Sequence, residues 1–108
     1  MHVIYRAMCE EELEGRCLDY PFSFSKGKFK WFSDDLGFIK DRVRDGSFNN
    51  SKFKPEAYAQ IVMFVVKDLS RFKRVSNKEL MLSVRDANSV KVLSFSVIHS
   101  DEYPFREL

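Results

Sequence analysis

Runs of apolar residues at the spacing of β-strands recur along the chain and predict five strands. Residues 3–6 are apolar up to a closing arginine, and residues 29–32 interleave a lysine with aromatic side chains. Residues 59–67 contain a continuous apolar run from Ile61 to Val66. Residues 79–84 and 90–98 carry the remaining patterns, and the last of these alternates between apolar and polar positions. The continuous run favours a central strand that is covered on both faces, whereas alternation favours a half-buried strand.

Two short helices are expected in the N-terminal half. Residues 10–13 are good helix formers, and a glycine two positions later is typical of a helix end. A second helix is predicted to begin at about Ser33, whose side chain can accept hydrogen bonds from unpaired first-turn amides, and to end at Gly46. Its apolar positions recur at steps of three and four residues: Leu36, Ile39 and Val43.

The stretches between these elements are predicted to be loops and turns. Residues 19–27 and 49–55 combine proline with glycine, asparagine or serine, residues 69–77 indicate a loop or short helix, and residues 86–89 indicate a turn. The sequence therefore predicts a small α+β protein with a single domain over residues 1–108. Its helices come early, and a mainly antiparallel or mixed sheet dominates the fold.

Composition and charge favour a folded protein over a disordered one. Hydrophobic residues make up 44% of the chain and aromatic residues 15%, so apolar surface is buried readily. The net charge of +2 is too small to predict nucleic-acid binding by itself. Residues 26–54 carry eight basic and four acidic side chains, a bias that suits a phosphate-bearing ligand and also an ordinary solvated surface.

Cysteine and histidine positions predict no metal site. Cys9 and Cys17 stand eight residues apart, and neither His2 nor His99 lies at metal-ligand spacing to another candidate. We interpret the cysteines as reduced thiols of a cytoplasmic protein, while their spacing leaves a disulfide open. The N-terminal residues lack the apolar run of a signal peptide, and no segment has the length of a membrane span, so no membrane association is expected.

Arg6 is the first candidate for ligand binding. It ends the first predicted strand, and its guanidinium presents five donors in a rigid fork that suits a carboxylate or a pyrophosphate. An exposed arginine or an ion pair with Glu10 or Glu11 is the alternative interpretation.

Ser33 and Glu79 are the other polar candidates, and each also has a structural explanation. A helix cap accounts for Ser33, and a solvated strand edge accounts for Glu79. Trp31 and Phe32 precede Ser33 directly, and we interpret both as core residues, with an aromatic platform for a ligand as the alternative. Glu79 becomes a functional candidate only if Arg6 and Ser33 lie on the same side of the sheet.

The order of these residues resembles the Arg…Ser…Glu scheme of ADP-ribosyltransferases. Tyr5-Arg6 lies on a first strand, Phe32-Ser33 ends a second strand, and Glu79 opens a late one. The opening Val3-Ile4-Tyr5-Arg6-Ala7-Met8, followed by acidic residues, is similar to that of small bacterial and phage members. The resemblance spans roughly residues 3–82 and rests on few residues.

The resemblance implies an ADP-ribosyltransferase-like fold and a protein that binds NAD as a substrate and transfers ADP-ribose to a macromolecular target. It implies that Arg6 contacts the pyrophosphate or the adjoining ribose of NAD. Ser33 would support the nicotinamide ribose and shape the pocket, with Trp31 or Phe32 near the nicotinamide. Glu79 would be the catalytic residue, because a carboxylate stabilises the oxocarbenium-like transition state. The resemblance also implies that the protein acts as a toxin or as an anti-defence protein of a phage.

The chain departs from the family pattern at two places. The family commonly carries Ser-Thr-Ser where Ser33 is followed by Asp34 here. Members that modify arginine carry a second Glu, or a Gln, two positions before the catalytic Glu, and Asn77 stands there in this chain. The departures place the choice of acceptor, and catalysis itself, in question.

Two other functions remain open on the sequence. A non-enzymatic binding module would use the same cleft to recognise a protein partner or a nucleotide. A nucleic-acid binder would use Trp31 with the lysines at 26, 28 and 30 and with Arg42 and Arg44. Nucleic-acid binding is disfavoured, because two helical residues that are two positions apart point in nearly opposite directions.

Overall fold

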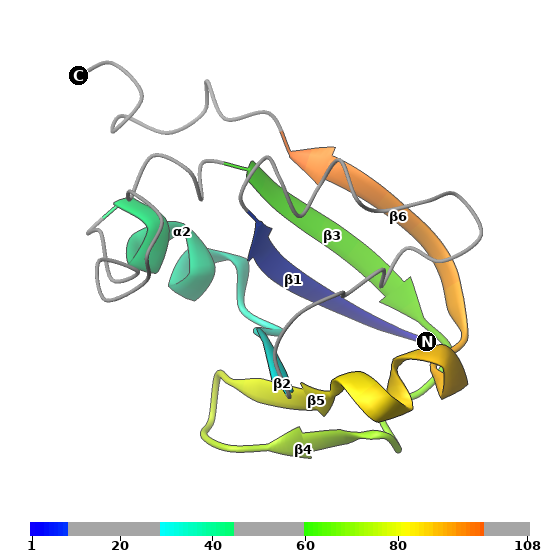
Figure 1. Cartoon of the computed structure of the whole chain (residues 1–108). Coiled ribbons are helices and arrows are strands. Elements are labelled where there is room, and N and C mark those ends of the chain that lie inside the picture. The colour runs from blue at the N-terminus through cyan, green and yellow to red at the C-terminus, as the bar shows by residue number, and fades with distance from the viewer. Residues whose placement is uncertain (9–28, 45–59, 99–108) are drawn as a thin grey trace.

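The computed structural model describes residues 1–8, 29–44 and 60–98, which form two three-stranded sheets and two helices (Figure 1). The first sheet has the order β1–β3–β6 and consists of β1 (His2–Met8), β3 (Gln60–Val66) and β6 (Val92–Ile98). The second has the order β2–β5–β4 and consists of β2 (Phe29–Phe32), β5 (Leu80–Ser83) and β4 (Phe72–Arg74). The helices are α2 (Leu36–Arg44) and the 3-10 helix η2 (Val84–Ser89).

Among the residues that the structure describes, a single backbone bridge joins the two sheets. The Tyr5 amide in β1 donates to the Ser33 carbonyl at 2.7 Å, and the Ser33 amide donates back to the Tyr5 carbonyl at 2.9 Å. The bridge is antiparallel and isolated, so the ladder between β1 and β2 does not continue on either side of it. The strands therefore diverge from a point where they are held at hydrogen-bonding distance.

The main core fills the space between the two sheets. Because successive side chains of a strand point to opposite faces, alternate positions of β1, β3, β2 and β5 supply it. Its buried strand residues are Ile4, Met8, Val62, Phe64, Val66, Phe32, Leu80 and Leu82. The Phe32 ring meets Phe64 and Phe72 edge-on, with ring centroids 6.0 and 5.3 Å apart, which is a favourable aromatic geometry.

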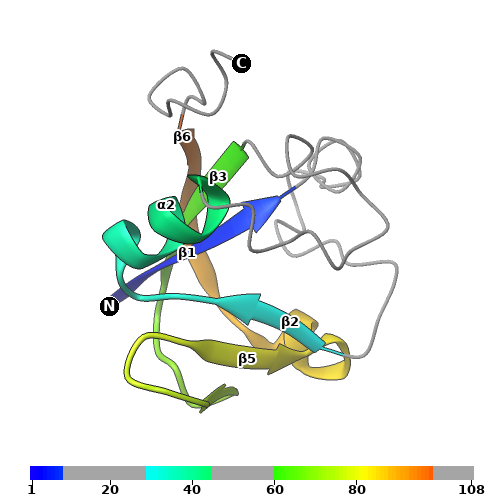
Figure 2. The same cartoon turned by 90° about the vertical axis from the view of Figure 1, so that its left-hand side faces the viewer.

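Helix α2 covers the other face of the first sheet. Figure 2 shows the helix lying across β1 and β3, on the side away from β2 and β5. Ile39 and Val43, four residues apart on one helix face, pack with Ala7 of β1 and Ile61 of β3. The described residues are thus arranged in three layers: the second sheet, the first sheet and the helix.

The five strands predicted from apolar patterns are confirmed, with small shifts at their ends. Strand β3 lies between β1 and β6, which confirms the central position expected from its continuous apolar run. Each pairing within the two sheets is antiparallel, in agreement with an α+β protein. The strands divide into two sheets because β1 and β2 pair only through the isolated bridge.

Two predictions for the C-terminal half are wrong. The stretch 69–77, expected to be a loop or short helix, contains the three-residue strand β4. Only one side chain of β4 is half-buried and the other two are exposed, so the sequence shows no apolar alternation there. The turn expected at 86–89 belongs to helix η2, which begins after Ser83 because the hydroxyl of that residue accepts a hydrogen bond from the Arg85 amide. The predicted early helix, the loops at 19–27 and 49–55 and both cysteines lie outside the described residues.

Truncating the central aromatic side chain of the core tests this packing. Phe64 is fully buried, so Phe64→Ala is expected to lower the free energy of unfolding by about 3–5 kcal/mol. Leu93→Ala, at a side chain that is 45% exposed on β6, is the control and should change it by less than about 0.5 kcal/mol. Urea unfolding measures both, and equal losses would contradict the assignment of Phe64 to the core.

Candidate functional site

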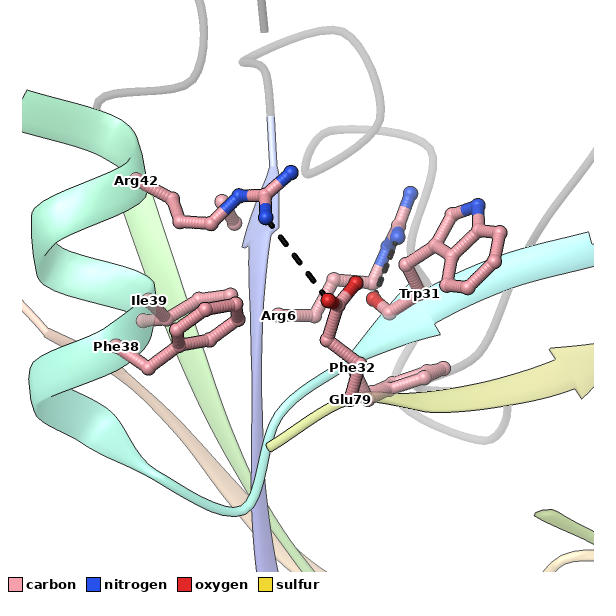
Figure 3. Close-up of a pocket in the computed structure, with 8 residues that line it drawn as sticks. Arg6, Trp31, Phe32, Phe38, Ile39, Arg42 and Glu79 are labelled. Carbon is pink, nitrogen blue, oxygen red and sulfur yellow. Dashed lines mark hydrogen bonds and ion pairs between the residues drawn. The ribbon is translucent and has the colours of Figure 1, made fainter. Parts of the chain in front are cut away.

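A pocket of about 350 Å³ opens where β1 and β2 diverge beyond the bridge. Its volume falls within the range of about 300–1,000 Å³ that is usual for small-molecule sites. Figure 3 shows the side chains around it. Its lining consists of Arg6 and Ala7 from β1, Trp31 and Phe32 from β2, Phe38, Ile39 and Arg42 from α2, and Glu79 directly before β5.

Arg6 spans the gap between the two diverging strands. Its position in β1 alternates with Tyr5 and Ala7, so its side chain leaves the strand on the side of the second sheet. The guanidinium Nη1 donates to the Trp31 carbonyl at 2.9 Å and lies 5.8 Å from the centroid of the Phe32 ring. The side chain thus supplies the hydrogen bond that a continuing backbone ladder would have supplied.

The two aromatic residues before Ser33 have different environments. Phe32 is buried and confirms the interpretation as a core residue. Trp31 is 48% exposed and lines the pocket, so the same interpretation is wrong for this residue. The strand alternation was predicted correctly, but the face that carries Phe29 and Trp31 points away from the main core. Lys30 shares the inner face of β2 with Phe32 and is half-buried. A lysine can occupy such a position because its aliphatic stem packs against apolar surface while its ammonium reaches water.

Glu79 meets a basic residue from α2 across the pocket. Its Oε1 lies 3.9 Å from Nη1 of Arg42, and the two side chains are 31% and 40% exposed. The Arg42 guanidinium also lies over the Phe38 ring, 5.3 Å from its centroid. Since this ion pair is long and exposed, it is a weak contact that a stronger anion can displace.

Ser33 is close to the pocket but does not line it. The residue is fully buried, and its hydroxyl donates to the Asp35 carbonyl at 3.1 Å and accepts from the Asp35 amide at 3.0 Å. These bonds fix the turn between β2 and α2. The hydroxyl is therefore engaged by the backbone two residues later.

The prediction that Ser33 caps the helix is wrong, because Asp35 takes this position. The Asp35 carbonyl accepts the first intrahelical bond, from Ile39, and its carboxylate Oδ1 accepts from the Phe38 amide at 3.0 Å. Helix α2 consequently begins at Leu36. The Phe38 amide bond is the main cause that lowers the pKa of Asp35, and the nearby Lys78 ammonium lowers it further.

Comparison with known proteins assigns no function to the site. No protein-family model, curated protein sequence or solved structure matches the chain. Among the described residues, His, Cys, Asp and Glu side chains form no group of three that would hold a metal ion. In the same part of the chain, no helix has the length and hydropathy to cross a membrane.

The structure brings together four of the five residues that were singled out in the sequence. Arg6, Trp31, Phe32 and Glu79 line one pocket, although they come from both sheets, and Ser33 lies behind it in the turn.

Sequence reasoning missed Phe38 and Arg42 as lining residues. Their spacing of four places them on one helix face, and this signal was available in the sequence.

The charges and rings of the pocket suit an anion that carries a flat ring. Two guanidiniums, from Arg6 and Arg42, face one carboxylate, so the lining has an excess of positive charge. Guanidinium groups bind phosphate or carboxylate oxygens with paired hydrogen bonds. The half-exposed indole of Trp31 and the Phe38 ring offer flat apolar surface beside them. A nucleotide combines both features.

The cap at the pocket-side end of α2 predicts a pH-dependent stability. Because its folded-state pKa is lowered from the ordinary value of 3.8, the Asp35 carboxylate stabilises the fold above that value. The contribution is lost as the pH falls through the lower folded-state pKa. Asp35→Asn should therefore have a lower Tm than the wild type at neutral pH, and the difference should shrink below about pH 4. A Tm difference that does not depend on pH would contradict this role.

Proposed function

We propose that the protein is ADP-ribosyltransferase-like, binds NAD in this pocket and transfers ADP-ribose to a macromolecular target. The observation that carries the proposal is the meeting of Arg6 and Glu79 with Trp31 and Phe32 around one open pocket. These residues are remote in the sequence and come from two sheets. The resemblance in residue order implies such a meeting for Arg6, Ser33 and Glu79; Arg6 and Glu79 line the pocket, whereas Ser33 does not.

In this proposal the arginine fork holds the pyrophosphate. The Arg6 guanidinium uses Nη1 for the Trp31 carbonyl, which fixes the fork at the pocket wall. Charge-assisted hydrogen bonds to phosphate are about twice as strong as neutral ones. The nicotinamide ring would lie near Trp31 or Phe32. Ser33 would act by shaping the wall, since its hydroxyl is bonded to the Asp35 backbone.

Glu79 is proposed to stabilise the charge that develops as nicotinamide leaves. The bond between the ribose C1′ and the nicotinamide nitrogen breaks, and its electron pair stays with the nitrogen, which becomes neutral. Positive charge then accumulates on the sugar, where a nearby carboxylate stabilises it. The acceptor adds its lone pair to C1′ and releases a proton. The Glu79 side chain is 31% exposed at the pocket, so it is accessible to a bound sugar.

The acceptor is proposed to be a macromolecule, as the resemblance implies, and the half-exposed Trp31 in the lining makes part of the pocket wall accessible from solvent. A protein that modifies a macromolecule in this way would act as a toxin or as an anti-defence protein of a phage. A protein target is preferred over nucleic acid because the net charge of the whole chain is only +2.

A non-enzymatic binding module is the second candidate, and one contact favours it. In the structure the Glu79 carboxylate faces Arg42 at 3.9 Å, an arrangement that neutralises the group proposed to act in catalysis. A protein that only recognises a nucleotide or a protein partner would retain the pair. Ligand binding without turnover is the expected behaviour of such a module.

Binding of ADP-ribose provides the first test. Trp31 is the only tryptophan, so its fluorescence reports directly on the pocket. ADP-ribose and NAD should both change this fluorescence and raise the Tm. Arg6→Lys keeps the charge and loses the fork, and it should weaken binding about tenfold or more, as expected for lost charge-assisted hydrogen bonds.

Arg85→Gln is the matched control for charge, because Arg85 is exposed on η2 and outside the pocket. It should leave the affinity unchanged. Absence of any fluorescence or Tm response at millimolar ligand would contradict a dinucleotide site.

Release of nicotinamide from NAD provides the second test and separates the two candidates. Glu79→Gln keeps the shape of the side chain and removes its charge, so it should bind ADP-ribose like the wild type and release nicotinamide at least about a hundredfold more slowly. Equal release rates would exclude Glu79 as the electrostatic residue. Binding without release by the wild type would favour the binding module.

A further inference from the structure

The turn between β4 and β5, residues 75–78, is tied to the β2–α2 junction by Arg74, which does not line the pocket. Arg74 Nη2 pairs with Oδ2 of Asp34 at 2.5 Å. Its Nη1 donates to the carbonyls of Ser76 and Asn77 at 3.2 and 3.1 Å. One guanidinium therefore holds three acceptors, two in the turn and one on the opposite sheet edge.

The strand register explains why Arg74 can reach Asp34. Arg74 stands opposite Leu80 in the β4–β5 pair, and Leu80 stands opposite Phe32 in the β2–β5 pair. Arg74 is thus level with the end of β2, where the chain turns toward α2 through Asp34. A longer or shifted β4 would move the guanidinium away from this junction, because each residue of a strand advances by about 3.3 Å.

The same turn carries the backbone of Glu79. The amides of Val75 and Ser76 both donate to the Glu79 carbonyl, at 3.0 and 3.4 Å. Lys78 adds a second tie, because its ammonium lies 3.6 Å from Oδ2 of Asp35 and 6.0 Å from the centroid of the Phe38 ring. The position of Glu79 relative to the pocket depends on how firmly this turn is held.

We propose that Arg74 is a positioning residue that holds Glu79 at the pocket by fixing the β4–β5 turn to Asp34. Single exposed ion pairs contribute little to stability, so the contribution of Arg74 lies in geometry more than in stability. The catalytic consequence rests on the proposed function: Glu79 has to face the ribose C1′, and a displacement of about 1 Å at a reacting group can slow a reaction about a hundredfold.

Hydrogen exchange of the Val75 and Ser76 amides tests the placement of Glu79 directly. Arg74→Gln removes the charge and the fork, and it should accelerate exchange at both amides about tenfold. Asp34→Asn should produce a smaller acceleration, because Arg74 keeps its bonds to the Ser76 and Asn77 carbonyls. The double variant should exchange little faster than Arg74→Gln alone, because Asp34 acts on the turn through Arg74.

Arg71→Gln is the matched control, since Arg71 is exposed just before β4 and lies outside these contacts. It should leave exchange at both amides unchanged. Unchanged exchange in Arg74→Gln, or equal acceleration in Arg71→Gln, would overturn the proposal.

Steady-state kinetics with NAD test the consequence for catalysis. Arg74→Gln should lower kcat for nicotinamide release about ten- to a hundredfold and leave KM and the affinity for ADP-ribose nearly unchanged. A loss confined to KM would overturn the positioning role.

The two arms distinguish failure of this proposal from failure of the proposed function. If the wild type releases no nicotinamide, the enzymatic function fails, while the exchange rates still decide whether Arg74 positions Glu79. If the wild type is active and Arg74→Gln matches it in kcat, the positioning role fails and the proposed function stands.

Discussion

The pair of backbone hydrogen bonds between Tyr5 and Ser33 is the constraint on which the rest of the structure depends. It is the only backbone pairing between the two sheets among the described residues, and it fixes the distance between β1 and β2 at one point. Apolar side chains fill the space between the sheets on both sides of this point, and the pocket opens beside them where the strands diverge, with Phe32 contributing to both. A continuous hydrogen-bonded ladder between β1 and β2 would have closed the gap in which the pocket lies. Without the bridge, no backbone contact would fix the position of one sheet against the other.

The divergence of the strands also places charge where a ligand can reach it. Arg6 lies in the gap because its strand continues past the bridge, and it donates to the Trp31 carbonyl there. The turn that Ser33 and Asp35 build next sets the start of α2, which brings Arg42 to the pocket opposite Glu79. The bridge, the turn and the helix thus form one connected support, so the site belongs to the fold's central junction and not to a peripheral loop.

The sequence predicted the strands well and their environment less well. The continuous apolar run at β3 favoured a strand covered on both faces, and β3 is indeed the central strand of its sheet. Alternation at β2 defined two faces, but it did not tell which face was buried, and Trp31 is on the exposed one. Ser33 was predicted as the helix cap, but its hydroxyl bonds the Asp35 backbone, and the Asp35 carboxylate accepts from the Phe38 amide in its place. The spacing of Phe38 and Arg42 on one helix face was visible in the sequence, but the contact of Arg42 with Glu79 was not, because the two residues are distant along the chain.

The central claim is that Arg6 and Glu79 bind one nucleotide ligand between them. A crystal structure with ADP-ribose tests it most directly. We predict density in the pocket at the divergence of β1 and β2, with the pyrophosphate on the Arg6 guanidinium and the terminal ribose within hydrogen-bonding distance of Glu79. Density for the ligand at another surface, or a pocket that stays empty at saturating ADP-ribose, would contradict the account.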